Sequence, residues 1–468
     1  MTAQSFLVRK SGIEKRWDPF YFQPHLVALE ARVRAKAKHT LRDFTLHMAG
    51  GSTPLKSESD QHYTTPDNGV PFIRVQNLTT TGELNLDDVK HITKSTHATL
   101  LGRSRLKGGE LLVKITGVGR MAIASVVPPK TEANINQHIA AIRTESALTS
   151  DALAAYLNLD FVEQLASRRS AGGTRPALDY AALLSLPVIE DARIVTLMQE
   201  AFAEKKKLEV TAATLLSTVN PQLLKQLGIT VAKQVANAAE AKFFTTSWRE
   251  VSHARWDSSF WNPESVLYEK AIEQGKFETQ PLDLLCEFSN QQWDVNEEFQ
   301  DSVPYLEISA IDTTTGKFLA PAIIGSSEAP SRAKMLVCTG DILISTTRPG
   351  RGAVAMVGLE HMPKFVASTG FAVIREVSNS IDKDYLYCLL RSEISLQQMN
   401  RRTSGGNYPA ITQKELEKIK IPVPPLHVQR QIVEAVKVIH TQASRLIDTA
   451  NQKINIAKAQ VEKMILGD

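Results

Sequence analysis

The chain has 468 residues, of which 43% are hydrophobic and 22% are charged. These proportions are typical of a soluble globular protein, and the length suffices for two to four domains with separate cores. No apolar run approaches the roughly 18 residues of a membrane span, and the first residues lack the features of a secretion signal. The net charge of +4 is compatible with a nucleic-acid partner but does not by itself indicate one.

Three cysteines, Cys286, Cys338 and Cys388, lie far apart in the second half of the chain. Their spacing matches neither a disulfide framework nor a zinc site, and it is typical of a protein from a reducing cytoplasm. We therefore expect a cytoplasmic protein in which each cysteine fills space in a core.

Four segments of the first half recur in the same order in the second half, 231 to 239 residues later. The pairs are residues 16–24 with 255–263, 72–84 with 305–318, 108–124 with 339–355, and 168–178 with 401–411. The small drift in offset is what loop insertions produce. The sequence therefore predicts one architectural unit written twice in tandem.

Each copy begins with an Arg-Trp-Asp turn, in which Trp17 or Trp256 is expected to anchor the entry to the domain. Short strands follow at residues 72–75 and 305–308. The apolar runs 110–116 and 341–347 are each followed by a glycine loop and a return strand, which predicts a hairpin. Residues 150–169 and 382–402 are each predicted to form a helix that ends in a double arginine.

A long helix is expected after each of these segments. From Val428 onward, apolar residues alternate at spacings of three and four up to Met464, with one stutter at Ala450. The first-half counterpart begins near Ala192 and is expected to break at Asn220–Pro221. A lone helix cannot bury such a stripe, so we expect the two helices to pair as an antiparallel coiled coil. The alternative is that each helix packs only on its own domain.

The expected organisation is a mixed α/β fold with two recognition domains, residues 1–190 and 246–425. Residues 191–245 and 426–468 would form the two spacer helices. On this interpretation, removal of the final helix from about Gln429 should leave each domain folded.

Catalytic motifs are missing from the sequence. It contains no phosphate-binding P-loop, no H-E-x-x-H and no G-x-S-x-G. The glycines of Gly117–Arg120 are only a fragment of a dinucleotide fingerprint and stand between two strands. We therefore expect a chain that binds rather than catalyses, with no metal and no cofactor of its own.

Two sets of polar residues are candidates for binding DNA. The first set lies in and beside the hairpin loops, where glycines allow close approach to a phosphate and basic side chains supply charge. It comprises Lys114, Thr116, Arg120, Thr346, Arg348 and Arg351. The alternative is an ordinary exposed turn whose basic residues serve solubility.

The second set lies at the end of each predicted helix and in the Gly-Gly segment that follows. Polar side chains differ there on a shared backbone frame, which suits recognition of two different sequences. The residues are Arg168, Arg169, Thr174, Arg175, Arg401, Arg402, Asn407 and Tyr408. The alternatives are helix-dipole complementation by the arginine pairs and a neutral linker that has diverged.

Residues 405–437, GGNYPAITQKELEKIKIPVPPLHVQRQIVEAVK, carry a resemblance to a known family. Together with the tandem repeat, this segment is similar to the specificity subunit of type I restriction–modification systems. The first copy departs from the pattern, because SLPVIEDARIVTLM keeps one proline and lacks the P-P-L and Q-R-Q signature.

The resemblance implies a non-catalytic subunit whose two target recognition domains each read one half of a split, asymmetric DNA target. It implies docking of two methyltransferase subunits, which bind S-adenosylmethionine and flip and methylate an adenine, and possible association with motor-nuclease subunits. The alternatives are a specificity subunit of a related type IIB-like system and a protein-binding coiled-coil scaffold that does not recognise DNA.

Overall fold

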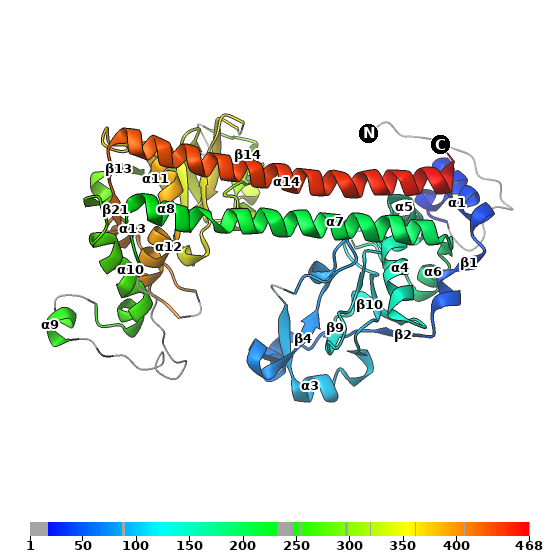
Figure 1. Cartoon of the computed structure of the whole chain (residues 1–468). Coiled ribbons are helices and arrows are strands. Elements are labelled where there is room, and N and C mark those ends of the chain that lie inside the picture. Colours follow the sequence, from blue (N-terminus) through cyan, green and yellow to red (C-terminus); the bar gives the residue numbers. More distant parts are fainter. Residues whose placement is uncertain are drawn as a thin grey trace. The chain divides into compact units, whose positions relative to one another are not determined.

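The computed structural model describes residues 17–86, 89–173, 175–231, 245, 247–252, 255–294, 298–318, 320–360, 362–406 and 408–467. It divides into two compact units (Figure 1). The first comprises residues 1–209 and 447–468, and the second comprises residues 210–446. Each unit contains one copy of the repeat.

The first unit is built on two sheets. A four-stranded antiparallel sheet has the order β2 (His47–Gly50), β10 (Ile139–Arg143), β7 (Leu111–Lys114) and β8 (Ala124–Val126). A five-stranded sheet has the order β3 (Tyr63–Thr64), β5 (Lys90–Thr93), β4 (Gly69–Ile73), β9 (Ala133–Ile135) and β6 (Arg105–Leu106). Only β4 and β9 run parallel in it, with Phe72 opposite Asn134. A further ribbon joins β1 (His39–Thr40) to β11 (Pro187–Val188).

Helices surround these sheets. The longer ones are α1 (Pro24–Lys36), α4 (Ala147–Leu157) and α5 (Asp160–Arg169). The short ones are η2 (Pro19–Phe22), η3 (Leu41–Phe44), η4 (Lys56–Glu58), α2 (Ser59–His62), η5 (Pro66–Asn68), η6 (Val75–Asn77), α3 (Lys94–Ala98), η7 (Gly102–Ser104) and α6 (Tyr180–Leu184).

The second unit repeats this arrangement. One sheet has the order β13 (Cys286–Ser289), β20 (Phe371–Val377), β17 (Ile342–Ser345) and β18 (Val354–Met356). The other has the order β15 (Ala322–Gly325), β14 (Ser302–Leu306), β19 (Lys364–Ser368) and β16 (Ala333–Cys338). The ribbon here joins β12 (Thr279–Pro281) to β21 (Lys420–Pro422).

Its longer helices are α10 (Pro263–Glu273), α11 (Lys383–Leu390) and α12 (Glu393–Arg401). The short ones are α9 (Trp248–Val251), η9 (Ser258–Trp261), η10 (Leu282–Leu284), η11 (Ile308–Ala310), η12 (Ser326–Glu328), η13 (Pro349–Arg351) and α13 (Gln413–Leu416).

The sheet topology confirms the predicted duplication. The strands of the four-stranded sheet follow the same order in both units, and β14 pairs in parallel with β19 as β4 does with β9. In that pair Tyr305 stands opposite Val366, so Tyr305 takes the place of Phe72. The first unit differs by the additional edge strand β3. The predicted hairpins are confirmed as β7–β8 and β17–β18.

The predicted single helix before each double arginine is wrong, because two shorter helices occupy each segment. In the first unit α4 ends at Leu157 and α5 begins at Asp160. The Asn158 side chain accepts from the Ala124 amide at 3.1 Å and donates to the Ala124 carbonyl at 2.7 Å. The side chain of Asn158 thus makes the two hydrogen bonds to Ala124 of β8 that a neighbouring strand would make. These bonds hold Asn158 at the break between α4 and α5.

The long helices are α7 (Ala192–Ser217), α8 (Val219–Leu227) and α14 (Leu426–Leu466). The interruption in the first-half helix falls at Thr218, before the predicted position, and Pro221 is tolerated in the first turn of α8. Gly228 ends α8 in the left-handed conformation, with φ of 64°. The rest of the expected 191–245 region includes residues 232–244, which lie outside the described residues.

Most of the predicted apolar seam of α14 is buried, while its members Val428 and Leu446 are half-buried. Its buried members are Ile432, Val436, Ile439, Ala443, Ala450, Ile454, Ala457 and Val461, but at the end Ile465 is buried in place of the predicted Met464. In the first unit, Ala457, Val461 and Ile465 share an apolar cluster with Ile194 and Met198 of α7. In the second unit, Ile432 and Val433 share one with Leu223 and Leu227 of α8.

The final helix is therefore part of both domain cores, since the unit boundary falls within it. This corrects the expectation that the chain from Gln429 onward could be removed with each domain left folded. Its removal would expose apolar surface in both cores.

We expect Ile465→Ala to lower the free energy of unfolding of the first unit by about 2–5 kcal/mol, because it leaves a cavity in that core. Hydrogen exchange of peptides from residues 139–169, followed by mass spectrometry, reports on this unit. The matched control is Ile456→Ala on the same helix, where the side chain is 56% exposed and the change should stay within about 0.5 kcal/mol. Equal protection in the two variants would contradict this assignment of Ile465 to the core.

Candidate nucleic-acid interface

The two sets of candidate residues, separated by some 60 residues in sequence, meet in each copy. In the second copy Thr347 forms a bridge with Ala410, and the Ile411 amide donates to the Thr346 carbonyl at 2.8 Å. The Arg348 amide donates to the Pro409 carbonyl at 2.7 Å. The hairpin loop after β17 and the Gly-Gly segment therefore form one connected surface.

The first copy repeats these hydrogen bonds. Thr116 forms a bridge with Ala177, the Leu178 amide donates to the Ile115 carbonyl at 2.8 Å, and the Gly117 amide donates to the Pro176 carbonyl at 3.1 Å. The shared backbone frame is thus present in both copies. Thr174 and Asn407, the candidates at the tips of the two Gly-Gly segments, lie outside the described residues.

A groove of about 390 Å³ opens beside this surface in the second copy. Three arginines, Arg332, Arg348 and Arg351, line it together with Tyr408, whose side chain is 72% exposed. Glu307 is the single acidic residue of the lining. The groove therefore has an excess of positive charge and presents an aromatic ring to solvent, a combination suited to a nucleic acid.

Arg348 holds an uncommon backbone conformation in this groove. Its φ of 51° places a residue with a Cβ atom in the left-handed region, which occurs in few non-glycine residues. The guanidinium carbon lies 4.6 Å from the centre of the Tyr408 ring. This stacking arranges the two side chains as one platform, with cation–π attraction in addition to the charge.

Arg332 and Glu307 were not among the residues predicted from the sequence. Arg332 immediately precedes β16 and donates to the Tyr305 hydroxyl at 3.2 Å and to the Glu307 carboxylate at 2.6 Å. No spacing pattern connects these residues, because a strand pairing and a loop bring them together. The only available signal was the position of Glu307 within the repeated segment 305–318.

In the first copy, two of the hairpin candidates are occupied by contacts within the domain. Arg120 forms an ion pair with Asp160 at 2.7 Å and donates to the Asn158 carbonyl at 2.6 Å. Lys114 is buried and donates to the Val118 carbonyl at 2.8 Å, and burial lowers the pKa of its amine. These contacts favour a structural role for both residues. Arg175 is exposed and stays a candidate, together with Thr116.

The double arginine of the first copy lies inside the domain. Arg168 and Arg169 are both buried, and both form ion pairs with Glu30 of α1. Arg168 also donates to the Tyr21 carbonyl at 2.7 Å, and Arg169 donates to the Leu165 carbonyl at 2.9 Å. One carboxylate thus joins α1 to the end of α5.

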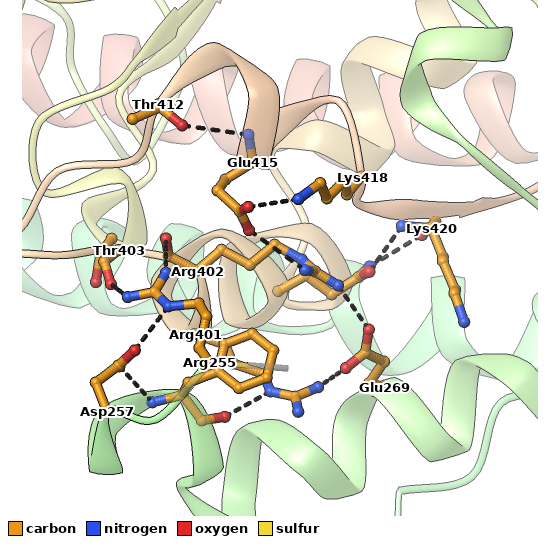
Figure 2. A network of polar contacts seen from close by, with 12 residues as sticks. Arg255, Asp257, Glu269, Arg401, Arg402, Thr403, Thr412, Glu415, Lys418 and Lys420 are labelled. Atoms are coloured by element: carbon orange, nitrogen blue, oxygen red, sulfur yellow. Dashed lines mark hydrogen bonds and ion pairs between the residues drawn. The ribbon is translucent and has the colours of Figure 1, made fainter. Parts of the chain in front are cut away.

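The second copy repeats this arrangement with Glu269 of α10, as Figure 2 shows. We call a glutamate with its two arginines the clamp of each copy. Glu269 pairs with Arg401 and, at 2.8 Å, with Arg402, which also approaches Glu415 at 3.6 Å. Arg401 donates to the Phe260 carbonyl at 2.6 Å. Burial and the neighbouring Arg402 lower the pKa of Arg401 to about 10.

These contacts correct the prediction for Arg168, Arg169, Arg401 and Arg402. Their guanidinium groups are engaged by carboxylates and carbonyls within the domains, and they are not available to a ligand as the described domains stand. The signal that could have found their partners is the repeat itself, because Glu30 and Glu269 are separated by the same 239 residues as the two Arg-Trp-Asp turns.

The predicted anchoring role of the entry tryptophans is also wrong. Trp17 is 80% exposed and Trp256 is 70% exposed. Trp256 stacks edge to face on Trp248, with ring centres 5.2 Å apart. The residues that hold the entry turn are its neighbours: Arg255 pairs with Asp257 at 2.7 Å and donates to the carbonyls of Arg402 and Thr403.

The three cysteines are free thiols. Burial raises the pKa of Cys286 to about 12 and that of Cys388 to about 11, so both remain protonated at neutral pH. Among the described residues, no group of three or more histidine, cysteine, aspartate and glutamate side chains could hold a metal ion. No described helix is long and apolar enough to cross a membrane.

Over part of its length, the chain is similar in sequence to type I restriction enzyme specificity subunits. Residues 275–455 match the family described as type I restriction modification DNA specificity domain. The chain is 29% identical over 131 residues to the HindI type I restriction enzyme specificity subunit of Haemophilus influenzae, which is 28% of each chain. It is 26% identical over 160 residues to the EcoDI specificity subunit of Escherichia coli, 34% of this chain and 33% of that one. The matches thus span about a third or less of these relatives.

Among solved structures, a chain from a type I restriction–modification system aligns over 92% of this chain and 97% of that one, with a TM-score of 0.40 and 17% identity. The HsdS subunit from Thermoanaerobacter tengcongensis aligns over 92% of this chain and 96% of that one, with a TM-score of 0.30 and 17% identity. The resemblance found in the sequence is therefore confirmed by the family and curated matches.

We expect Glu269→Ala to destabilise the second unit by about 3–5 kcal/mol, because it leaves the buried Arg401 without its carboxylate and leaves the half-buried Arg402 with only the more distant Glu415. Hydrogen exchange of peptides from residues 383–402 measures this loss. The control is Glu83→Ala, which removes the exposed Glu83–Lys206 ion pair and should cost less than about 1 kcal/mol. A wild-type exchange profile in the Glu269 variant would show that the clamp does not hold α10 to α12.

Proposed function

We propose that this chain, whose residues 275–455 belong to the type I restriction modification DNA specificity domain family, is the DNA-recognition subunit of a restriction–modification complex. Its role is to read a bipartite, asymmetric DNA target and to dock methyltransferase subunits, with catalysis carried by those partners. Motor-nuclease subunits join such a complex for cleavage. The cofactor S-adenosylmethionine belongs to the methyltransferases and not to this chain.

The observation that carries the proposal is the arginine-lined groove of the second copy. It lies within the matched residues and combines three arginines with an exposed tyrosine on a rigid, hydrogen-bonded loop pair. Arginine forks suit the acceptors of guanine and of phosphate, and a tyrosine ring can contact a base or a sugar. A scaffold that binds only protein gives no reason for this concentration of positive charge.

Reading of two different half-sites is supported by a charge difference at equivalent positions. The registers of the β4–β9 and β14–β19 pairs place Arg74 in the first copy where Glu307 stands in the second. Likewise Arg351 of the groove has no described side-chain partner, whereas its counterpart Arg120 is paired with Asp160. Two copies with opposite charges on one frame present different surfaces to DNA.

The pairing of the long helices is supported by the two cores. The start of α7 shares an apolar cluster with the end of α14, and the end of α8 shares one with the start of α14. From these two clusters we propose that the two helices run antiparallel. Such a pair would set the spacing between half-sites and offer docking surface to the methyltransferases.

Binding to a randomised duplex library, with the neighbouring methyltransferase co-purified, tests the proposal. We expect enrichment of a split motif and an affinity that falls steeply with salt, as phosphate contacts require. Enrichment of no motif would contradict DNA recognition and favour a protein scaffold. Cleavage at fixed distances on both sides of the target would instead assign the chain to a type IIB-like system.

We expect Arg351→Ala and Tyr408→Ala each to weaken binding of the enriched duplex by about 1–3 kcal/mol. An arginine that contacts phosphate would also reduce the slope of log affinity against log salt by about one. The matched control is Lys270→Ala on α10, which removes an exposed positive charge outside the groove. A loss in Lys270→Ala equal to that in Arg351→Ala would mean that only net charge matters.

Exchange of residues 1–190 for the corresponding domain of another specificity subunit should change only one half of the enriched motif. The physical reason is that each copy has its own core and its own loop surface. The readout is the motif selected from the library by the chimaera. A change in both halves together would contradict independent reading by the two copies.

A further inference from the structure

A second pocket, outside the groove described above, lies within the first copy. It has a volume of about 750 Å³ and opens between η3, α4 and the start of α7. Apolar side chains form much of its lining, among them Phe44, Leu153, Val188 and Ile194. Two further leucines, Leu46 and Leu148, also line it and are 65% and 72% exposed. An apolar pocket with large exposed leucines is a feature of protein-binding sites.

The charged residues of this pocket have one sign. Its lining includes Asp43, Glu145, Glu190 and Asp191, and it includes no lysine or arginine. The only residue of the lining that can become cationic is His39, which lies 3.6 Å from Glu190. No hydrogen bond or ion pair to the Glu145 side chain is found among the described residues, so its charge is uncompensated.

The second copy fills the corresponding place with its own side chains. In both copies a tyrosine hydroxyl donates at 3.0 Å to the carbonyl of a proline in the exit strand, Tyr156 to Pro187 and Tyr385 to Pro422. The two tyrosines are not at equivalent positions, because the offset of 233 residues that relates the double arginines matches Tyr385 with Ala152. The first copy therefore has a small residue where the second has a buried ring, and Ala152 lines the pocket.

Gln429 closes the second copy further. Its side chain is fully buried, accepts from the Asp382 amide at 2.7 Å and donates to the carbonyls of Ser380 and Pro424. The Q-R-Q segment that supplies Gln429 has no counterpart in the first copy. The two copies thus differ where the domain meets its long helix. Buried side chains of the chain itself occupy this place in the second copy, and a pocket occupies it in the first.

From these observations we infer that the pocket of the first copy binds a segment of a partner polypeptide that carries a lysine or arginine beside an apolar side chain. Asp191 is paired with Arg193 at 2.6 Å. The remaining carboxylates of the lining, Asp43, Glu145 and Glu190, repel phosphates, which disfavours a nucleic acid as the occupant. A small cation could neutralise the carboxylates, but it could not cover the apolar floor of the pocket or the exposed leucines at its rim. The occupant therefore needs an apolar side chain as well as a positive charge. This inference rests on the proposed function, since the partner we assign is a methyltransferase subunit of the complex.

A consequence is that the two methyltransferase docking sites are unequal. In the second copy, the buried side chains of Tyr385 and Gln429 occupy the position that corresponds to the pocket of the first copy. The methyltransferase bound through the first copy would be held more tightly and more sensitively to salt.

Two variants of the full chain test this inference in the assembled complex. Ala152→Tyr fills the pocket in the way that the second copy is filled, and Glu145→Lys combined with Glu190→Lys reverses its charge. We expect the affinity for one of the two methyltransferase subunits to fall at least tenfold in each variant, with the other unchanged. Native mass spectrometry over a concentration series counts the bound subunits. The control is Glu376→Lys, an exposed charge reversal in the second copy.

Wild-type affinity in both variants, or an equal loss of both subunits, would overturn the inference while the proposed function stands. A wild-type chain that binds no methyltransferase would overturn both. A photo-crosslinking amino acid in place of Leu148, at the rim, supplies an independent readout. It should capture a methyltransferase peptide containing lysine or arginine, and the same substitution at Leu359, an exposed site in the second copy, should not. Capture of a purely acidic peptide would also overturn the inference.

Discussion

In each copy of the repeat, one carboxylate faces two arginines at the end of a helix, and the packing of that helix end depends on this clamp. The carboxylate is buried in the first copy and half-buried in the second. Glu30 and Glu269 each join the first long helix of a domain to the double arginine that precedes the Gly-Gly segment. The segment in turn bonds to the hairpin loop. Because an isolated buried charge is so costly, the clamp favours one packing of these elements, and the hydrogen-bonded loop pair is held to that packing.

The clamp leaves the outer surface free to diverge. With the arginine pairs engaged internally, Arg348 and Tyr408 are among the side chains that the same frame presents at the groove. A frame that holds its shape independently of its outer residues can exchange Arg74 for Glu307 without loss of fold. The same divergence seals one junction with Tyr385 and Gln429 and leaves the other open. Duplication thus provides two equal scaffolds with unequal surfaces.

The final helix connects this local order to the whole chain. Its buried seam contributes Ile432 to the core of one unit and Val461 to that of the other. A helix shared in this way cannot be a separate module, because apolar surface removed from either core would be exposed to water. The stability of both domains therefore depends on the same element.

The sequence by itself determined the duplication, the paired hairpins and most of the buried seam of the last helix, because periodicity and repetition are local properties that a chain displays without folding. Only the tertiary structure decided which polar groups face inward. In the sequence, Arg168 and Arg169 look like part of a basic patch. In the structure they are buried and form ion pairs with Glu30, which is distant in sequence. Trp17 looks like a core residue and is exposed, whereas Arg332, which no pattern marked, lines the groove. Burial and charge pairing arise between segments far apart in the chain, so no local pattern records them.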